Sequence, residues 1–286
     1  DILLFLEQEK ERLGEAFEPD RYVYFMPEAE GPCRFGMYNK YQRIVLDSFP
    51  EFRRVKIASL TSKNSYSLDG MFEKGETANF RKAAYFSVVV GDILDRLLWR
   101  VRPYEREPGM ADEFMEKAMR TLSDAFETYG ARRDFDRILE RLDEVVLEGR
   151  GLIDPAVPPK PLIGIVGEIY LRTHVQANQQ VIRMLETYGA EVVNASIAEW
   201  VNYTTYDRLR EAKIGLRMSL KQFRLDRIQG HLKSILSYGI ELYYQHMRQN
   251  QVYDRVKGVI DLCKDHRVDE LDKVLQEEDL FSFDVG

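Results

Sequence analysis

The sequence predicts an α/β protein with two parallel-sheet units and with helical segments between and after them. Two observations lead to this fold class. A strand, a loop, a helix and a second strand follow one another within residues 22–59, and the same order returns within residues 162–195. A strand pair of this kind is parallel and is joined through a right-handed helical crossover. The two units share their organisation but not their sequence.

We expect five regions along the chain. They are a first α/β unit at 1–105, a helical segment at 106–153, a proline-rich linker at 154–161, a second α/β unit at 162–205 and a helical segment at 206–286. The linker is the clearest boundary, because four prolines in eight residues exclude both a continuing helix and a central strand. The second unit is incomplete, since two strands cannot build a layered core alone.

In the first unit, apolar spacing predicts each element in turn. The expected elements are a helix within 1–16, a strand at 22–26, a helix at 38–48, a strand at 54–59 and a buried helix at 77–99. Pro27 ends the first strand, and the Arg102-Pro103 pair stops the buried helix.

The remaining elements are mostly helical. We expect amphipathic helices at 110–129 and 133–148, a strand at 162–166, a helix at 175–188, a strand at 191–195 and a helical pattern from 206 to about 275. Gly130 separates the first two of these helices and Gly189 caps the third, as glycine does at helix ends.

Composition limits the classes of function. The chain has 286 residues, 44% of them hydrophobic, and a net charge of −7, which argues against nucleic-acid binding because phosphates need a basic surface. The sequence has no apolar run of membrane-spanning length and no signal segment, and two distant cysteines give no disulfide framework. We therefore expect a cytoplasmic protein. The chain opens at Asp1 within an amphipathic pattern, so we also expect an internal piece of a longer protein.

The loop after the first strand contains one of the two cysteines. It reads Gly31, Pro32, Cys33 and Arg34, followed by Gly36. Taken alone, Cys33 is best interpreted as a small packed side chain. The functional alternative is a thiolate or an anion-binding turn, because Arg34 and a following helix N-terminus both favour negative charge. Cys263, on a helical pattern, is interpreted as a packing residue.

A second polar loop follows the strand at 162–166. After Gly167 it places Glu168, Tyr170, Arg172 and His174 within seven positions. An enzyme can use such a set as a proton donor or base and as an anion clamp. The other interpretation is a polar surface loop without chemistry.

A basic stripe is predicted on a helix that begins near Asp207. At helical spacing, one narrow arc contains Arg210, Lys213, Arg217, Lys221 and Arg224. Most stripes of this kind are solvated faces. The functional alternative is a docking surface for an acidic partner or for the phosphates of a large cofactor.

Two segments carry a resemblance to a known family. They are FMPEAEGPCRFGMYNKYQRIVLD at 25–47 and PLIGIVGEIYLRTHVQANQQVIRMLETYGAEV at 161–192. With both in view, the chain resembles the iron–sulfur family of 2-hydroxyacyl-CoA dehydratases and benzoyl-CoA reductases. It is most similar to the dehydratase-like half of the long CoA-enzyme activase proteins. The resemblance covers most of residues 20–205.

The resemblance implies flavodoxin-like, Rossmann-like α/β units around a 4Fe–4S cluster held largely by cysteines. It also implies an ATP-dependent activase as electron donor and an acyl-CoA thioester as substrate. Cys33 matches a cluster cysteine, and Gly31, Pro32 and Arg34 are its neighbours in the cofactor-binding turn. In the second loop, Glu168 and Arg172 are the candidate catalytic residues, with Gly167 and Asn178 as cofactor-binding candidates.

This chain departs from the family pattern in its cysteine count. A cluster needs about four ligands, and the other cysteines are expected outside this sequence or in another chain of a homo- or heterodimer. As an isolated chain it is expected to be inactive, although the family pattern is that of a lyase or reductase. The hypothesis from another class is a non-catalytic α/β scaffold that docks an acidic partner through helix 210–224.

Overall fold

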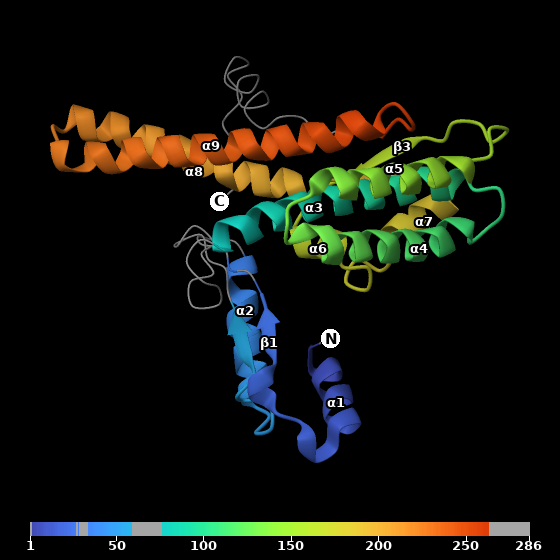
Figure 1. Cartoon of the computed structure of the whole chain (residues 1–286), viewed down its shortest axis with the longest axis horizontal. Coiled ribbons are helices and arrows are strands. Elements are labelled where there is room, and N and C mark those ends of the chain that lie inside the picture. Colours follow the sequence, from blue (N-terminus) through green and yellow to red (C-terminus); the bar gives the residue numbers. More distant parts are fainter. Residues whose placement is uncertain (1, 27, 29–33, 59–75, 263–286) are drawn as a thin grey trace. The chain divides into compact units, whose positions relative to one another are not determined.

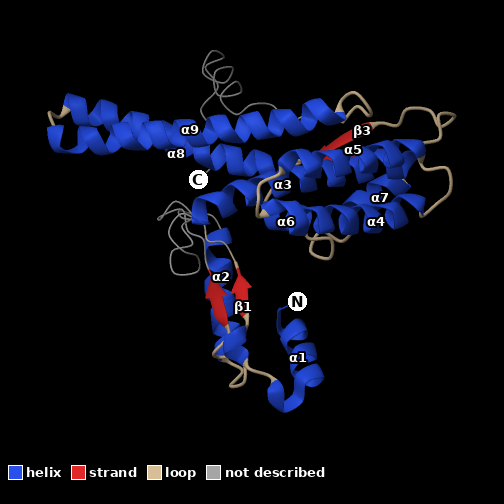
Figure 2. Ribbon diagram, in the orientation of Figure 1, coloured by secondary structure: helices blue, strands red, loops and turns tan. Residues whose placement is uncertain are grey.

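The computed structural model describes residues 2–26, 28, 34–58 and 76–262. The chain divides into two units, and the boundary falls between Thr77 and Ala78. About 70% of the described residues are helical. In the part of the chain that is described, both sheets have only two strands (Figure 2). The protein is therefore mainly helical.

The described part of the first unit contains two α-helices and one strand pair (Figure 1). Its elements are α1 (Ile2–Leu13), β1 (Val23–Phe25), α2 (Phe35–Asp47) and β2 (Lys56–Ala58). The small core consists of Leu6, Leu46, Phe52 and Val55. Arg43 of α2 donates to the carbonyl oxygens of Val55 and Arg53 at 2.6 and 3.0 Å, which fastens the segment before β2 to the helix.

The second unit begins within the long helix α3 (Glu76–Val101). Its further elements are α4 (Met110–Ala125), a π-helical turn (Phe126–Gly130), α5 (Phe135–Gly151), β3 (Leu162–Ile165), α6 (Ile169–Thr173), α7 (Val181–Thr187), β4 (Glu191–Asn194), α8 (Ile197–Lys221) and α9 (Leu225–Val256). Residues 154–161 form neither helix nor strand, and they lie inside this unit.

The predicted pair of flavodoxin-like sheet units is wrong. Each predicted strand pair exists and is parallel, with Val23 opposite Lys56 in the first and Leu162 opposite Glu191 in the second. A doubly wound fold needs a larger sheet with helices on both faces. Here the apolar residues between the strand pairs recur at helical spacing, so they pack against other helices.

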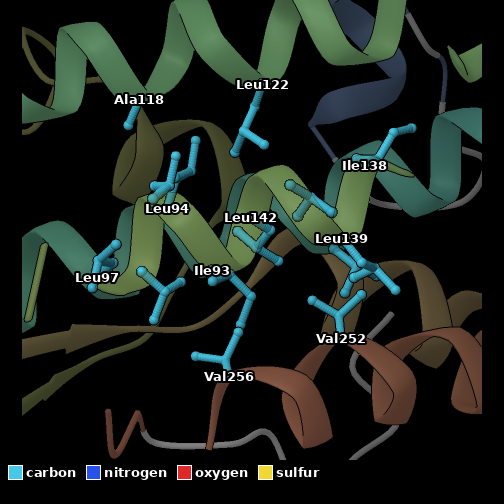
Figure 3. Close-up of a cluster of buried hydrophobic side chains, with 14 of the residues drawn as sticks. Ile93, Leu94, Leu97, Ala118, Leu122, Ile138, Leu139, Leu142, Val252 and Val256 are labelled. Atoms are coloured by element: carbon cyan, nitrogen blue, oxygen red, sulfur yellow. The ribbon is translucent and has the colours of Figure 1, made fainter. Parts of the chain in front are cut away.

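Three helices build the main core of the second unit. Figure 3 shows side chains of α3, α4 and α5 converging, with Val252 and Val256 of α9 closing the cluster. Phe86 is fully buried, and its ring centroid lies 4.2 Å from that of Phe135. Elsewhere in this core, Gly149 of α5 permits the close approach of Phe114 of α4, because a Cβ atom at Gly149 would lie 3.0 Å from the Phe114 ring.

A buried polar seam joins α3 to the hairpin formed by α8 and α9. The Tyr85 hydroxyl donates to Asn202 Oδ1 at 2.8 Å, and the Asn202 amide donates to Gln249 Oε1 at 3.0 Å. Gln245 donates to the Thr205 hydroxyl at 2.9 Å. Because unpaired polar groups are costly inside a protein, these bonds fix the register of the two helices.

The two helices of the hairpin run side by side, and their far end extends beyond the other helices of the unit (Figure 1). Gly215 of α8 lies against the His231 ring of α9, where a Cβ atom would be 2.5 Å from the imidazole. The prediction of one helical face from Arg210 to Arg224 is wrong, since α8 ends at Lys221. Phe223 has a φ of 53°, which reverses the chain.

No described helix is both long and apolar enough to cross a membrane.

Candidate functional site

A helix cap orders the loop that follows β3. Gly167 has a φ of 138°, a backbone conformation that favours glycine, and Glu168 follows it as the N-cap of α6. Oε2 of Glu168 accepts a hydrogen bond from the Leu171 amide at 2.8 Å. The candidate catalytic carboxylate therefore has a structural contact that fixes its position.

Arg172 ties this loop to the end of β4. Its side chain is buried, and its guanidinium donates to the carbonyl oxygens of Ala195 and Ser196. The amides of Asn178 and Asn194 both donate to the Arg172 carbonyl, at 3.4 and 2.9 Å. The structure thus brings the Asn178 side chain to the Arg172 backbone.

The two remaining polar residues of the loop contact each other. The ring centroids of Tyr170 and His174 are 4.8 Å apart, and His174 Nδ1 accepts from the Ala177 amide at 3.1 Å. The imidazole is therefore part of the loop's own hydrogen bonding. The side chains of Glu168, Arg172 and His174 all hydrogen-bond to the loop's own backbone or to the residues that follow β4.

A small pocket lies beside this loop, at the carboxyl end of β4. Its lining residues are Asp92, Asp95, Arg96, Trp99, Thr173 and Asn194–Ile197. Asp92 is buried, and its carboxylate accepts from the amides of Ile197 and Ala198 at 2.9 and 2.8 Å. This contact places a negative charge on the N-terminus of α8, where the helix dipole favours it.

The α3 side of the pocket holds two further ionisable groups. Arg96 is buried, whereas Asp95 is exposed. Partial removal of the Asp95 carboxyl from water raises its pKa above its usual range. Sequence reasoning missed these residues, although Asp92, Asp95 and Arg96 are the three charges within the mostly apolar stretch 83–99 of α3, which was a usable signal.

The start of α8 was also missed. The Ser196 hydroxyl accepts from the Glu199 amide at 3.0 Å and caps the helix. Ser-Ile-Ala-Glu at 196–199 is a capping-box pattern, which predicts a helix beginning at Ile197. This signal would have placed the start of the helix directly after the strand at 191–195.

The cysteine turn of the first unit falls outside the described residues. This applies to Gly31, Pro32 and Cys33, and also to Cys263. The flanking part is described: Arg34 is exposed at the N-cap of α2. Before the turn, Glu28 accepts from the Asn39 amide at 3.1 Å and lies 3.4 Å from Lys40 Nζ. Two side chains of α2 thus hold Glu28 in place.

The described residues do not by themselves fit a metal cluster. Within them, no three His, Cys, Asp or Glu side chains are grouped to hold a metal ion. They include no cysteine. A cluster would require Cys33 together with thiolates from elsewhere.

The predicted basic stripe is divided in the structure. Arg210 lies 3.5 Å from Asp207, and Arg224 lies in the turn, paired with Asp226 at 3.3 Å. The other members, Lys213, Arg217 and Lys221, are exposed on α8. Over the described ranges, none of these three forms an ion pair.

Comparison with the models of known families gave no match, and neither the curated proteins nor the solved structures contained a similar chain.

Proposed function

We propose that this chain is part of an iron–sulfur, electron-accepting protein that acts with an ATP-dependent activase on a CoA thioester or a similar substrate. One observation supports it best. Both segments that carry the family resemblance include a strand of a parallel pair and the helix that follows it in the described residues: 25–47 starts at the last residue of β1 and ends with α2, and 161–192 contains β3 and α6. Segments that follow strands often carry binding and catalytic residues.

In this proposal the two loops have different tasks. Cys33 is one ligand of a 4Fe–4S cluster, and the remaining thiolates come from other cysteines of the natural protein or from a partner chain. A bound cluster supplies a low-potential electron for reduction of the thioester. Glu168 and Arg172 are the proposed substrate-side residues, and the contacts of Arg172 hold their loop on β4. Two cysteines without a disulfide framework favour a cytoplasmic location.

The proposal is tested on the natural protein that contains this sequence, purified without oxygen. We expect a brown protein with broad absorbance in the blue, bound iron and acid-labile sulfide, and bleaching when the activase and ATP are added. The same protein with the activase but without ATP is the control. A colourless, iron-free protein after anaerobic reconstitution would contradict the proposal.

A second candidate function is docking of an acidic partner through α8. The observation that favours it is a set of exposed cations, Lys213, Arg217 and Lys221, that form no ion pair with any other described residue, on a chain whose net charge is −7. Exposed charges of this kind act mainly by steering a partner of opposite sign.

Charge reversal tests this docking surface. With fluorescent polyglutamate as the probe, we expect the Arg217→Glu, Lys221→Glu variant to bind at least about tenfold more weakly at low salt, because attraction becomes repulsion. The matched control is Lys233→Glu on α9, which should change binding less. Affinity that ignores both salt and the double reversal would identify the stripe as a solvated face.

A further inference from the structure

We propose that the outer face of α9 is a self-association surface, which pairs with the same face of a second copy of this chain. This inference does not depend on the iron–sulfur proposal. Six large apolar residues stand on the exposed side of this helix: Leu225, Leu232, Leu236, Ile240, Tyr243 and Met247. Their exposed fractions range from 39% at Met247 to 72% at Leu225 and Tyr243.

These six residues, here called the α9 stripe, form one continuous surface. At 3.6 residues per turn they fall within about 80° of the helix circumference, along about 33 Å of its length. Leu225 and Leu232, Leu236 and Tyr243, and Ile240 and Met247 are pairs separated by seven residues. A second helix with the same spacing can pack along such a seam.

The interior of the protein does not cover the α9 stripe. The buried residues of α9 are Leu242, Gln245, Gln249, Val252, Tyr253 and Val256, which face α3, α5 and α8. At helical spacing they point to nearly the opposite side of α9 from the stripe. In Figure 1 the far half of the hairpin extends beyond the other helices of its unit.

The exposed apolar area is close to what a dimer needs. If a large apolar residue offers about 200 Å² when fully exposed, the α9 stripe exposes roughly 700 Å² per copy. A specific protein interface of standard size buries about 800 Å² per partner. Isolated monomers rarely expose an apolar patch of this size.

The charge distribution favours a second copy as the occupant. The whole chain has a net charge of −7, so two copies repel each other over most of their surface. Between Leu225 and Met247 the formal charge is zero, because Asp226 and Glu241 offset Arg227 and Lys233. None of these four charged residues lies within the arc of the α9 stripe. Two copies therefore do not repel each other where their stripes meet.

The same face suits a twofold arrangement. Pairing two α9 helices in antiparallel orientation places Leu236, the middle of the stripe, next to its own copy, as a twofold interface requires. Gly239 borders the arc one turn further on, and nothing lies within 4 Å of the position that its Cβ would occupy. This allows the two helix backbones to approach closely.

Sedimentation equilibrium of the whole chain over a micromolar concentration range tests the inference. We expect a dimer for the wild type and, for Leu236→Glu, a dimer dissociation constant at least about 100-fold larger, because each copy would bury an unpaired carboxylate. Tyr243→Glu is a second variant of the same kind. Ser237→Glu adds the same charge to the next residue, outside the stripe, and should remain dimeric.

Circular dichroism of all three variants checks that helix content is unchanged, which their exposed positions favour. A wild type that sediments as a monomer throughout would overturn the inference, and this includes the case in which another part of the chain or a different protein covers the stripe. A Leu236→Glu variant that stays dimeric would overturn it as well.

Discussion

Replacing Arg102 with alanine is expected to lower the free energy of unfolding by about 3–5 kcal/mol, the usual cost of removing one partner from a buried ion pair. Arg102 follows α3 directly, and its guanidinium contacts both carboxylate oxygens of Glu186 at 2.7 and 2.9 Å. Both side chains are about nine-tenths buried, at 10% and 9% exposure. Glu186 would lose this bidentate partner.

The effect of Arg102→Ala extends beyond a single pair. Arg102 also lies 3.2 Å from Asp112 of α4, which in turn contacts Arg183 of α7 at 2.7 Å. The network thus joins α3, α4 and α7. Chemical denaturation in urea measures the loss, with Arg141→Ala as the control. Arg141 has an exposed pair with Glu144, and its replacement should cost less than about 1 kcal/mol. Equal losses of unfolding free energy in Arg102→Ala and Arg141→Ala would contradict the conclusion that the ion pairs of Arg102 stabilise the fold.

Replacing Phe86 with alanine is expected to cost about 3–5 kcal/mol through lost apolar burial and the cavity that remains. Phe86 has no exposed surface and lies between the rings of Phe135 and Phe126, with centroids 4.2 and 6.1 Å away. Those partners come from α5 and the π-helical turn, so the ring joins three elements of the core.

Thermal and urea unfolding of Phe86→Ala measure this loss. Phe223→Ala is the matched control, because it removes the same side chain from the hairpin turn, where Phe223 is 86% exposed. We expect a change within about 0.5 kcal/mol there. A Phe86→Ala protein that unfolds at the same urea concentration as the wild type would show that this cluster is not the core.

The local elements were largely predictable, because each depends on a pattern within a few residues. The strand at 162–165 is a short apolar run before Gly167, and the buried helix at 76–101 shows apolar spacing over its whole length. The size of the sheets was not predictable. An apolar run, alternating or continuous, has the same sequence pattern in a strand with one neighbouring strand as in a strand with two.

The hairpin turn and the loop contacts show what a sequence pattern leaves out. Phenylalanine is rare at positive φ, so nothing in the sequence marks Phe223 as the residue that reverses the chain. The polar loop at 167–174 was recognised by its residue types. That Arg172 is buried and binds carbonyl oxygens at the end of β4 depends on residues 23 and 24 positions away, which no local pattern encodes.

The most direct test of the iron–sulfur proposal is the iron content of two single-cysteine variants of the natural protein, reconstituted under the same anaerobic conditions. Cys33→Ala is expected to lose most of the iron and the visible absorbance, whereas Cys263→Ala should keep both. Unchanged iron in Cys33→Ala would contradict the assignment of Cys33 as a cluster ligand and with it the proposed function of the first loop.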